Sequence, residues 1–234
     1  MITLYSGLVV RQPLVETLIP AFEAATGTRI DATFEPTTVL LDRIATGERP
    51  DLLLGVASSV RALAEQGILD GGSVSEIAVS AVGFARLPDS PAPEDDSAAA
   101  FLDYLVSAEA VAYTLSGASG LHFVEAMRRR DLLDRIDQRA VRLPAGLTAE
   151  AVVDGRASVA IQQVSELRSV DGAHIVEPIP HELQSYARFA IGVRTGAADA
   201  ARSFAASLVG ARAAAAFAEV GLSAARAPER EGAS

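Results

Sequence analysis

Short segments rich in hydroxyl groups and glycine are the residues of this sequence that could do chemistry. Each falls between the end of an expected strand and the start of an expected helix, where free backbone N–H groups and a hydroxyl can point at an anion. N-caps and tight turns use the same residue types, but four such segments together favour an anion-binding site. The candidate ligands are Ser6 and Gly7, Thr37 and Thr38, Ser58 within residues 57–59, and Ser116, Ser119 and Gly120 within residues 116–120.

The segment 116–120, with the sequence Ser-Gly-Ala-Ser-Gly, is more typical of an anion nest than of a simple cap, because glycine allows close approach of the backbone. It is not the phosphate-binding loop of nucleotide-binding proteins, since the chain contains no Lys. Arg11 is the basic residue that we expect to complete the anion clamp.

The composition excludes several classes of function. The 234 residues include 20 basic ones, all of them Arg, and 30 acidic ones, which gives a formal net charge of -10. This balance disfavours binding to nucleic acid or to an anionic membrane, so an anionic ligand must be held by a local site. Cys is absent, which excludes disulfides, thiolate catalysis and Cys-based zinc sites, and three scattered His residues predict no metal site. No apolar stretch reaches the length of a membrane span.

Three residues could act as a general base if the protein is an enzyme: His122, Glu166 and His181. His122 directly follows the 116–120 segment, although a structural role in the first helical turn is an equal alternative. Glu166 fits a carboxylate that stabilises the first turn of a helix, and His181 lies in a proline-flanked loop. Tyr186 begins an expected strand that returns between the two halves of the chain, where alternate side chains would face a cleft.

The pattern of apolar residues predicts an α/β fold. Expected strands at residues 2–5, 30–34 and 51–54 are each followed by a turn and a helix within the first 70 residues. Such repeated units form a parallel sheet, with ligands at the carboxyl ends of its strands.

The rest of the chain predicts a second lobe. An apolar strand at 77–87 leads into a loop rich in Pro, Asp and Ser, followed by helices and strands up to residue 161, a returning strand at 186–193 and Ala-rich helices at 198–220. We expect one lobe from residues 1–80 plus 187–234 and another from residues 81–186. Two chain crossings between them would form a hinged ligand cleft.

The sequence resembles the molybdate-binding proteins among the extracellular solute-binding proteins, which are type II periplasmic binding proteins of ABC transporters. The resemblance rests on the opening segment 2–7, on 19–27 (Ile-Pro-Ala-Phe-Glu-Ala-Ala-Thr-Gly), on 50–54, on 116–120 and on the Ala-rich C-terminal helices. It implies two α/β lobes that close over a small anion, with no metal or cofactor and with an ABC permease as partner. Ser6 and Thr38 match the hydroxyl positions that bind the oxyanion, and Ser119 and Gly120 match a backbone donor.

One position departs from the family pattern. Gln163 stands where molybdate binders present a Tyr, and an amide suits an organic acid better than a bare oxyanion. Aconitate-isomerase-like enzymes resemble the same family, so a cofactor-independent isomerase that moves a proton next to a carboxylate is the alternative. The location is expected to be periplasmic if a leader was removed and cytoplasmic if Met1 is the native start.

Overall fold

In the computed structural model, which describes residues 1–225, the first three strands form the expected parallel sheet. β1 (Ile2–Ser6) lies between β2 (Ile30–Phe34) and β3 (Leu52–Val56) and is parallel to both. Apolar residues dominate β1 and β3, and their paired residues Leu4 and Leu52 are fully buried. The carboxyl ends of the three strands therefore lie at one edge of the sheet, and a helical segment begins directly after each.

The helices of this first lobe pack around its sheet. The segment after β1 is helical without a break from the 3-10 turn η1 (Leu8–Val10) through α1 (Arg11–Pro13), the π-helical η2 (Leu14–Leu18) and α2 (Ile19–Thr26). Gly27 ends α2 in the left-handed conformation, with φ 69°. The other elements are α3 (Thr37–Ala45), α4 (Ala57–Glu65) and the 3-10 turn η3 (Gly71–Ser73).

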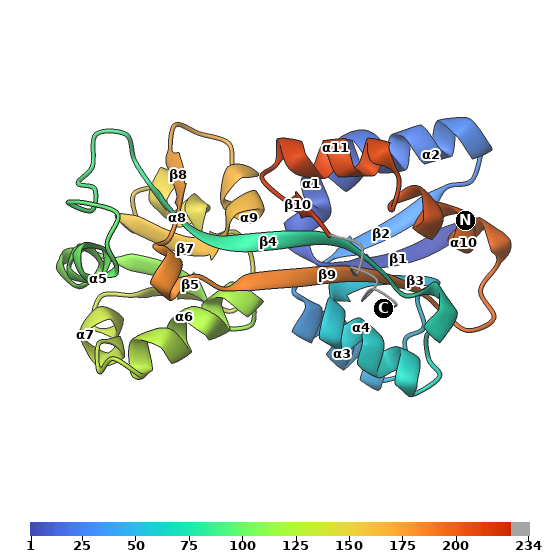
Figure 1. Cartoon of the computed structure of the whole chain (residues 1–234), viewed down its shortest axis with the longest axis horizontal. Helices are drawn as coiled ribbons and strands as arrows, with labels where there is room; N and C mark the ends of the chain where they lie inside the picture. The colour runs from blue at the N-terminus through green and yellow to red at the C-terminus, as the bar shows by residue number, and fades with distance from the viewer. Residues whose placement is uncertain (226–234) are drawn as a thin grey trace, which may run out of the picture.

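Two long strands connect the lobes. β4 (Ser75–Arg86) and β9 (Tyr186–Val193) are antiparallel and run side by side between the two halves of the molecule (Figure 1). Residues 75–81 of β4 pair with β9 and residues 82–86 pair with β7 and β8, so β4 belongs to both sheets. The main strand order is β2-β1-β3-β9-β4-β7-β5-β6, and two further strands, at residues 175–178 and 223–224, pair with β4.

The second lobe repeats the α/β arrangement. β5 (Val111–Thr114) is parallel to β6 (Val141–Leu143) and to β7 (Val159–Gln163), while β8 (Ile175–Pro178) pairs with β4. Its helices are α5 (Ala98–Ser107), α6 (Ala118–Arg128), α7 (Leu133–Asp137), α8 (Ala149–Val153), α9 (Val164–Arg168) and the 3-10 turn η4 (His181–Leu183). The chain then returns through β9 to α10 (Asp199–Ser207), α11 (Ala211–Glu219) and β10 (Ser223–Ala224) in the first lobe.

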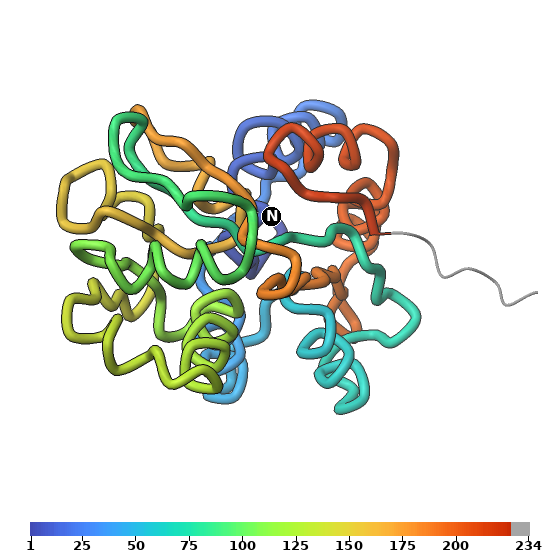
Figure 2. The backbone as a smooth tube through the Cα atoms, turned by 60° about the vertical axis from the view of Figure 1, so that its left-hand side comes forward, coloured from blue at the N-terminus to red at the C-terminus, as the bar shows by residue number. Residues whose placement is uncertain are grey.

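Each lobe has its own buried core. The clusters of buried apolar side chains draw either on residues 2–78 and 189–222 or on residues 82–183. Figure 2 shows the same division, because the beginning and the end of the described chain share one half of the molecule. The domain boundaries given above stay a prediction, and residues 226–234 of the expected first lobe lie outside the described residues. No helix in the described part of the chain is both long and apolar enough to cross a membrane.

Candidate functional site

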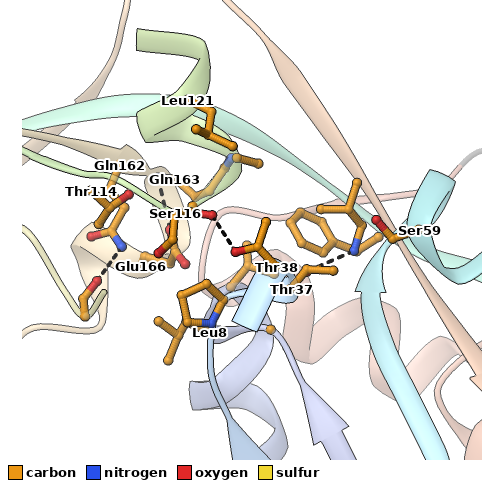
Figure 3. A pocket seen from close by; sticks show the side chains of 18 residues that line it. Leu8, Thr37, Thr38, Ser59, Thr114, Ser116, Leu121, Gln162, Gln163 and Glu166 are labelled. Atoms are coloured by element: carbon orange, nitrogen blue, oxygen red, sulfur yellow. Dashed lines mark hydrogen bonds between the residues drawn. The ribbon is translucent and has the colours of Figure 1, made fainter. Parts of the chain in front are cut away.

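A cavity of about 220 Å³ lies between the lobes, where helical segments of both begin (Figure 3). The first lobe contributes residues from the ends of β1, β2 and β3, and the second lobe contributes residues from the ends of β5 and β7. The lining residues are Gly7, Leu8, Val9, Pro36, Thr37, Thr38, Val56, Ser59 and Phe189 from the first lobe, and Thr114, Ser116, Gly117, Ala118, Leu121, Gly146, Gln162, Gln163 and Glu166 from the second.

The N-termini of three helices, α3, α4 and α6, lie at this cavity. Their cap residues Pro36, Val56 and Gly117 all line it. The first N–H groups of a helix have no partner within the helix, and the helix dipole makes this end positive. Among the described residues that line the cavity none is Arg, Lys or His, so positive potential here comes from backbone groups.

Glu166 is the ionisable residue of the described cavity wall. It lies in the first turn of α9, half-buried, and its Oε2 accepts a hydrogen bond from the backbone N–H of Gln163 at 3.3 Å. Burial, which disfavours the charged form, raises the pKa of this carboxyl to about 7 despite the opposing effects of that hydrogen bond and of one from the Gln162 side chain. The cavity therefore contains a group that can hold or release a proton near neutral pH.

Two buried polar side chains of the second-lobe wall are Thr114 and Gln163, with 2% and 3% of their surface exposed. The Gln163 side chain accepts the backbone N–H of Glu166, and the Glu166 carboxyl accepts the backbone N–H of Gln163, so the two residues form a capping box at the start of α9. Thr114 Oγ1 has no hydrogen-bond partner among the described residues. It lies close to Gly117 and Gly120 at the start of α6. Gln162, next to Gln163, is engaged within the protein, because its Oε1 accepts from the N–H and the hydroxyl of Thr148 and its Nε2 donates to the carbonyl of Gly146.

Three hydroxyls of the cavity wall are engaged within the protein, two from the first lobe and one from the second. Thr37 Oγ1 accepts the N–H of Val56 at 3.2 Å, which ties the start of α3 to the start of α4. Thr38 Oγ1 donates to the carbonyl of Ser116 at 2.9 Å and so connects the two lobes across the cavity mouth (Figure 3). The hydroxyl of Ser116 donates to the carbonyl of Pro144.

The structure brings six of the residues predicted from the sequence to the cavity wall: Gly7, Thr37, Thr38, Ser116, Gln163 and Glu166. Their roles toward a ligand stay a prediction.

Four other predicted ligands do not line the cavity. Ser6 is fully buried and donates its hydroxyl to the Gly7 carbonyl, and Ser58 turns outward while its neighbour Ser59 lines the wall. Ser119 and Gly120 are buried in α6. A Cβ on Gly120 would lie 1.9 Å from the Thr114 carbonyl oxygen, so glycine is needed here for packing of α6 against β5.

The predicted clamp residue Arg11 and the other base candidates also lie elsewhere. Arg11 is exposed, with its guanidinium 6.0 Å from the ring of Phe34, and Tyr186 is 60% exposed. The imidazole of His122 hydrogen-bonds the carbonyl of Leu183 at 2.8 Å, inside the second lobe. His181 lines a separate depression together with Tyr186.

Sequence reasoning missed Thr114, Gln162 and Ser59 as residues of the wall. Thr114 ends β5, directly before the 116–120 segment, and Gln162 directly precedes Gln163 on β7. The available signal was the position of a polar residue at the carboxyl end of a strand.

Comparison with known proteins identifies the family. The sequence model described as bacterial extracellular solute-binding protein matches residues 2–223, nearly the whole chain. The chain belongs to this family. A relative of this solute-binding protein described as aconitate isomerase, from a Pseudomonas species, is 31% identical over 176 residues, which cover 73% of this chain and 67% of that protein.

Solved structures share the fold of this solute-binding protein. The periplasmic molybdate-binding protein of Azotobacter vinelandii superposes with a TM-score of 0.77 over 95% of this chain and 98% of that chain, at 15% identity. L-phospholactate-bound PEB3, a protein of Campylobacter jejuni, superposes with a TM-score of 0.68 over 95% and 99% of the two chains, also at 15% identity. These likenesses confirm the expected two-lobed periplasmic-binding-protein fold.

Proposed function

We propose that this solute-binding protein binds a small organic anion, a carboxylate rather than molybdate, in the cavity between its lobes. The observation that carries the proposal is the convergence of three helix N-termini on a cavity whose described wall has no cationic side chain. Backbone N–H groups at such ends stabilise negative charge without a counter-ion.

The wall of the second lobe favours a carboxylate over molybdate. Gln163 carries an amide in the cavity wall, and an amide offers a donor as well as an acceptor. A fully deprotonated tetrahedral oxyanion has only acceptor atoms, whereas a polyfunctional organic acid can carry a hydroxyl or a protonated carboxyl beside its charged group.

The family membership supports a role in transport. Solute-binding proteins of this fold deliver their ligand to a membrane permease, so an ABC permease is the proposed partner and the extracytoplasmic side of the membrane the proposed location.

Thermal unfolding with a panel of small anions tests the proposed ligand class. We expect cis-aconitate or trans-aconitate to stabilise the protein and molybdate to have no effect. A ligand at a hundredfold excess over its Kd stabilises the folded state by about 2.7 kcal/mol. Stabilisation by molybdate alone, or by none of the carboxylates, would overturn the proposal.

A second candidate function is an isomerase, because Glu166 lines the cavity with its pKa raised to about 7 and because a relative is described as aconitate isomerase. An ionised Glu166 would take a proton from a methylene carbon next to a carboxylate. The double bond would shift by one carbon, and the proton would return to the far end of the three-carbon unit. Helix N-termini at the cavity would stabilise the charge that develops on the carboxylate.

Ultraviolet absorbance separates the two functions. An isomerase drives cis-aconitate and trans-aconitate, mixed separately with the protein, to the same final spectrum, and Glu166→Gln abolishes the change. Constant absorbance together with thermal stabilisation leaves binding as the function.

A further inference from the structure

The wall of the proposed anion site contains a carboxyl group, that of Glu166, which would itself be negatively charged when ionised. It lies in the cavity wall next to Gln163, whose backbone N–H donates to one of its oxygens, Oε2. The Gln162 side chain also hydrogen-bonds this carboxyl and lowers its pKa, against the larger effect of burial. Figure 3 shows the side chain on the same side of the cavity as Gln163 and Thr114.

No neighbouring charged group accounts for the raised pKa of Glu166. α9 packs against β4, β7, β8 and η1, and the charged groups on or beside these elements are engaged elsewhere. Burial and hydrogen bonds, with no charged neighbour among the causes, set the pKa of Glu166. Arg86 pairs with Glu177, Glu76 pairs with Arg61 and Arg188, Arg168 lies against Gly221, Arg11 lies near the ring of Phe34, and His174 hydrogen-bonds the Leu167 carbonyl.

We propose that Glu166 meets the anion as a neutral carboxylic acid that donates a hydrogen bond to it, so that each anion is bound together with one proton. This inference rests on the proposed function and specifies how the same cavity selects its ligand. It makes Glu166 a ligand-binding residue in its protonated form, where the isomerase alternative requires the ionised form.

The physical reason is the balance of charge within the cavity. An ionised Glu166 facing a bound anion would place two negative charges in a poorly solvated space with no cationic side chain in the described wall. Protonation removes the repulsion and creates an O–H donor to the anion, a charge-assisted hydrogen bond of the strong class. The pKa of about 7 in the ligand-free protein makes the proton available near neutral pH, and a bound anion raises that pKa further.

The wall then offers a complementary pattern to a carboxylate ligand. Glu166 supplies an O–H donor, and the N-termini of α3, α4 and α6 supply backbone N–H donors for the charged groups of the same ligand. The substrate class that fits is a carboxylic acid with a second polar group, taken up with a proton.

Isothermal titration calorimetry with trans-aconitate tests the inference. Titrations at pH 8 in two buffers with different heats of ionisation give the number of protons bound with each anion. We expect the wild type to take up nearly one proton more per anion than Glu166→Gln, whose own value reports any proton bound by the ligand itself. Glu150→Gln, an exposed Glu-to-Gln change in α8 outside the cavity, is the matched control and should behave as the wild type.

The pH dependence of affinity provides a second measurement that needs no variant. The Kd of the wild type for trans-aconitate should rise about tenfold for each pH unit above 7. Binding with equal proton uptake in wild type and Glu166→Gln, or a wild-type Kd that stays constant from pH 7 to pH 9, overturns the inference and leaves the proposed function intact. If neither trans-aconitate nor cis-aconitate binds at any pH, the proposed function itself fails and this inference falls with it.

Discussion

The two walls of the cavity differ in how their polar side chains are used. In the wall of the first lobe, Thr37 and Thr38 hydrogen-bond to other parts of the protein, and the remaining side chains are mostly apolar. In the wall of the second lobe, Thr114 Oγ1 has no partner among the described residues, and Glu166 is a titratable carboxyl in a capping box with Gln163.

This difference indicates a division of roles. The first lobe contributes shape and two helix N-termini, those of α3 and α4, whose positions are fixed by internal hydrogen bonds. The second lobe contributes the titratable carboxyl of Glu166, and we expect its wall to determine which ligand is accepted. Substitutions in the first wall should therefore change stability and closure, and substitutions in the second wall should change affinity and pH dependence.

The largest expected effect concerns stability and Glu166. Its pKa is raised from 4.5 to about 7 in the folded protein, so folding retains a proton that the unfolded chain releases between these values. The free energy of unfolding therefore falls as the pH rises from about 4.5 to 7, by about 3 kcal/mol, and stays low above this range. Glu166→Gln should lack this loss. Urea unfolding at pH 4 and pH 8 gives the free energy of unfolding of both proteins. An equal change in this free energy between the two pH values in both proteins would contradict the prediction.

Gln163→Met should lower affinity more than stability. The side-chain oxygen accepts the N–H of Glu166 at the cap of the short helix α9, a bond whose loss costs about 1 kcal/mol, while the amide NH₂ is the donor that we expect to contact a carboxylate of the ligand. Loss of a hydrogen bond to a charged ligand costs about 1.5–3 kcal/mol, which is a ten- to hundredfold increase in Kd for trans-aconitate. Calorimetry gives the Kd and urea unfolding the stability. Unchanged affinity would remove Gln163 from the site.

Thr37→Val makes the opposite prediction for the first wall. The Val56 N–H loses its acceptor while the side chain keeps its size, so the free energy of unfolding should fall by about 1 kcal/mol. The Kd for trans-aconitate should change by less than about twofold. An affinity loss as large as that of Gln163→Met would erase the distinction between the walls.

The smallest expected effect belongs to the hydrogen bond between the lobes. Thr38→Val removes the bond to the Ser116 carbonyl, which is exposed, so the affinity should fall by about two- to fivefold, or about 0.5–1 kcal/mol. Thr46→Val removes a similar exposed bond, to the Arg43 carbonyl, within the first lobe alone and is the matched control. Equal Kd values for the two variants would show that the Thr38 bond does not contribute to closure over the ligand.

The fold was largely predictable because its signals are local. Apolar periodicity located the parallel units of the first lobe, and the returning strand at residues 186–193 coincides with β9. The short strands β6 and β10 were not predicted, because three-residue and two-residue strands depend on a neighbouring strand for their conformation.

The site was less predictable because side-chain direction depends on packing. The sequence indicated which turns meet, and Thr37, Thr38, Ser116 and Gln163 do line the cavity. It could not show that Ser6 would turn to a backbone carbonyl or that His122 would hydrogen-bond η4. Nor could it show that Gly120 is needed for close packing of α6 against Thr114. The distance between these two residues depends on the conformation of the turn that connects them.

Blocking the cavity is the most direct test that it is the binding site. Ala118 is exposed at the first residue of α6 and lines the cavity, so Ala118→Trp should fill the cavity without disturbing a core. The matched control is Ala25→Trp at an exposed position of α2. Calorimetry should show one trans-aconitate bound per chain in the wild type and in the control, and no binding to Ala118→Trp. Equal binding to all three proteins would contradict the assignment of this cavity.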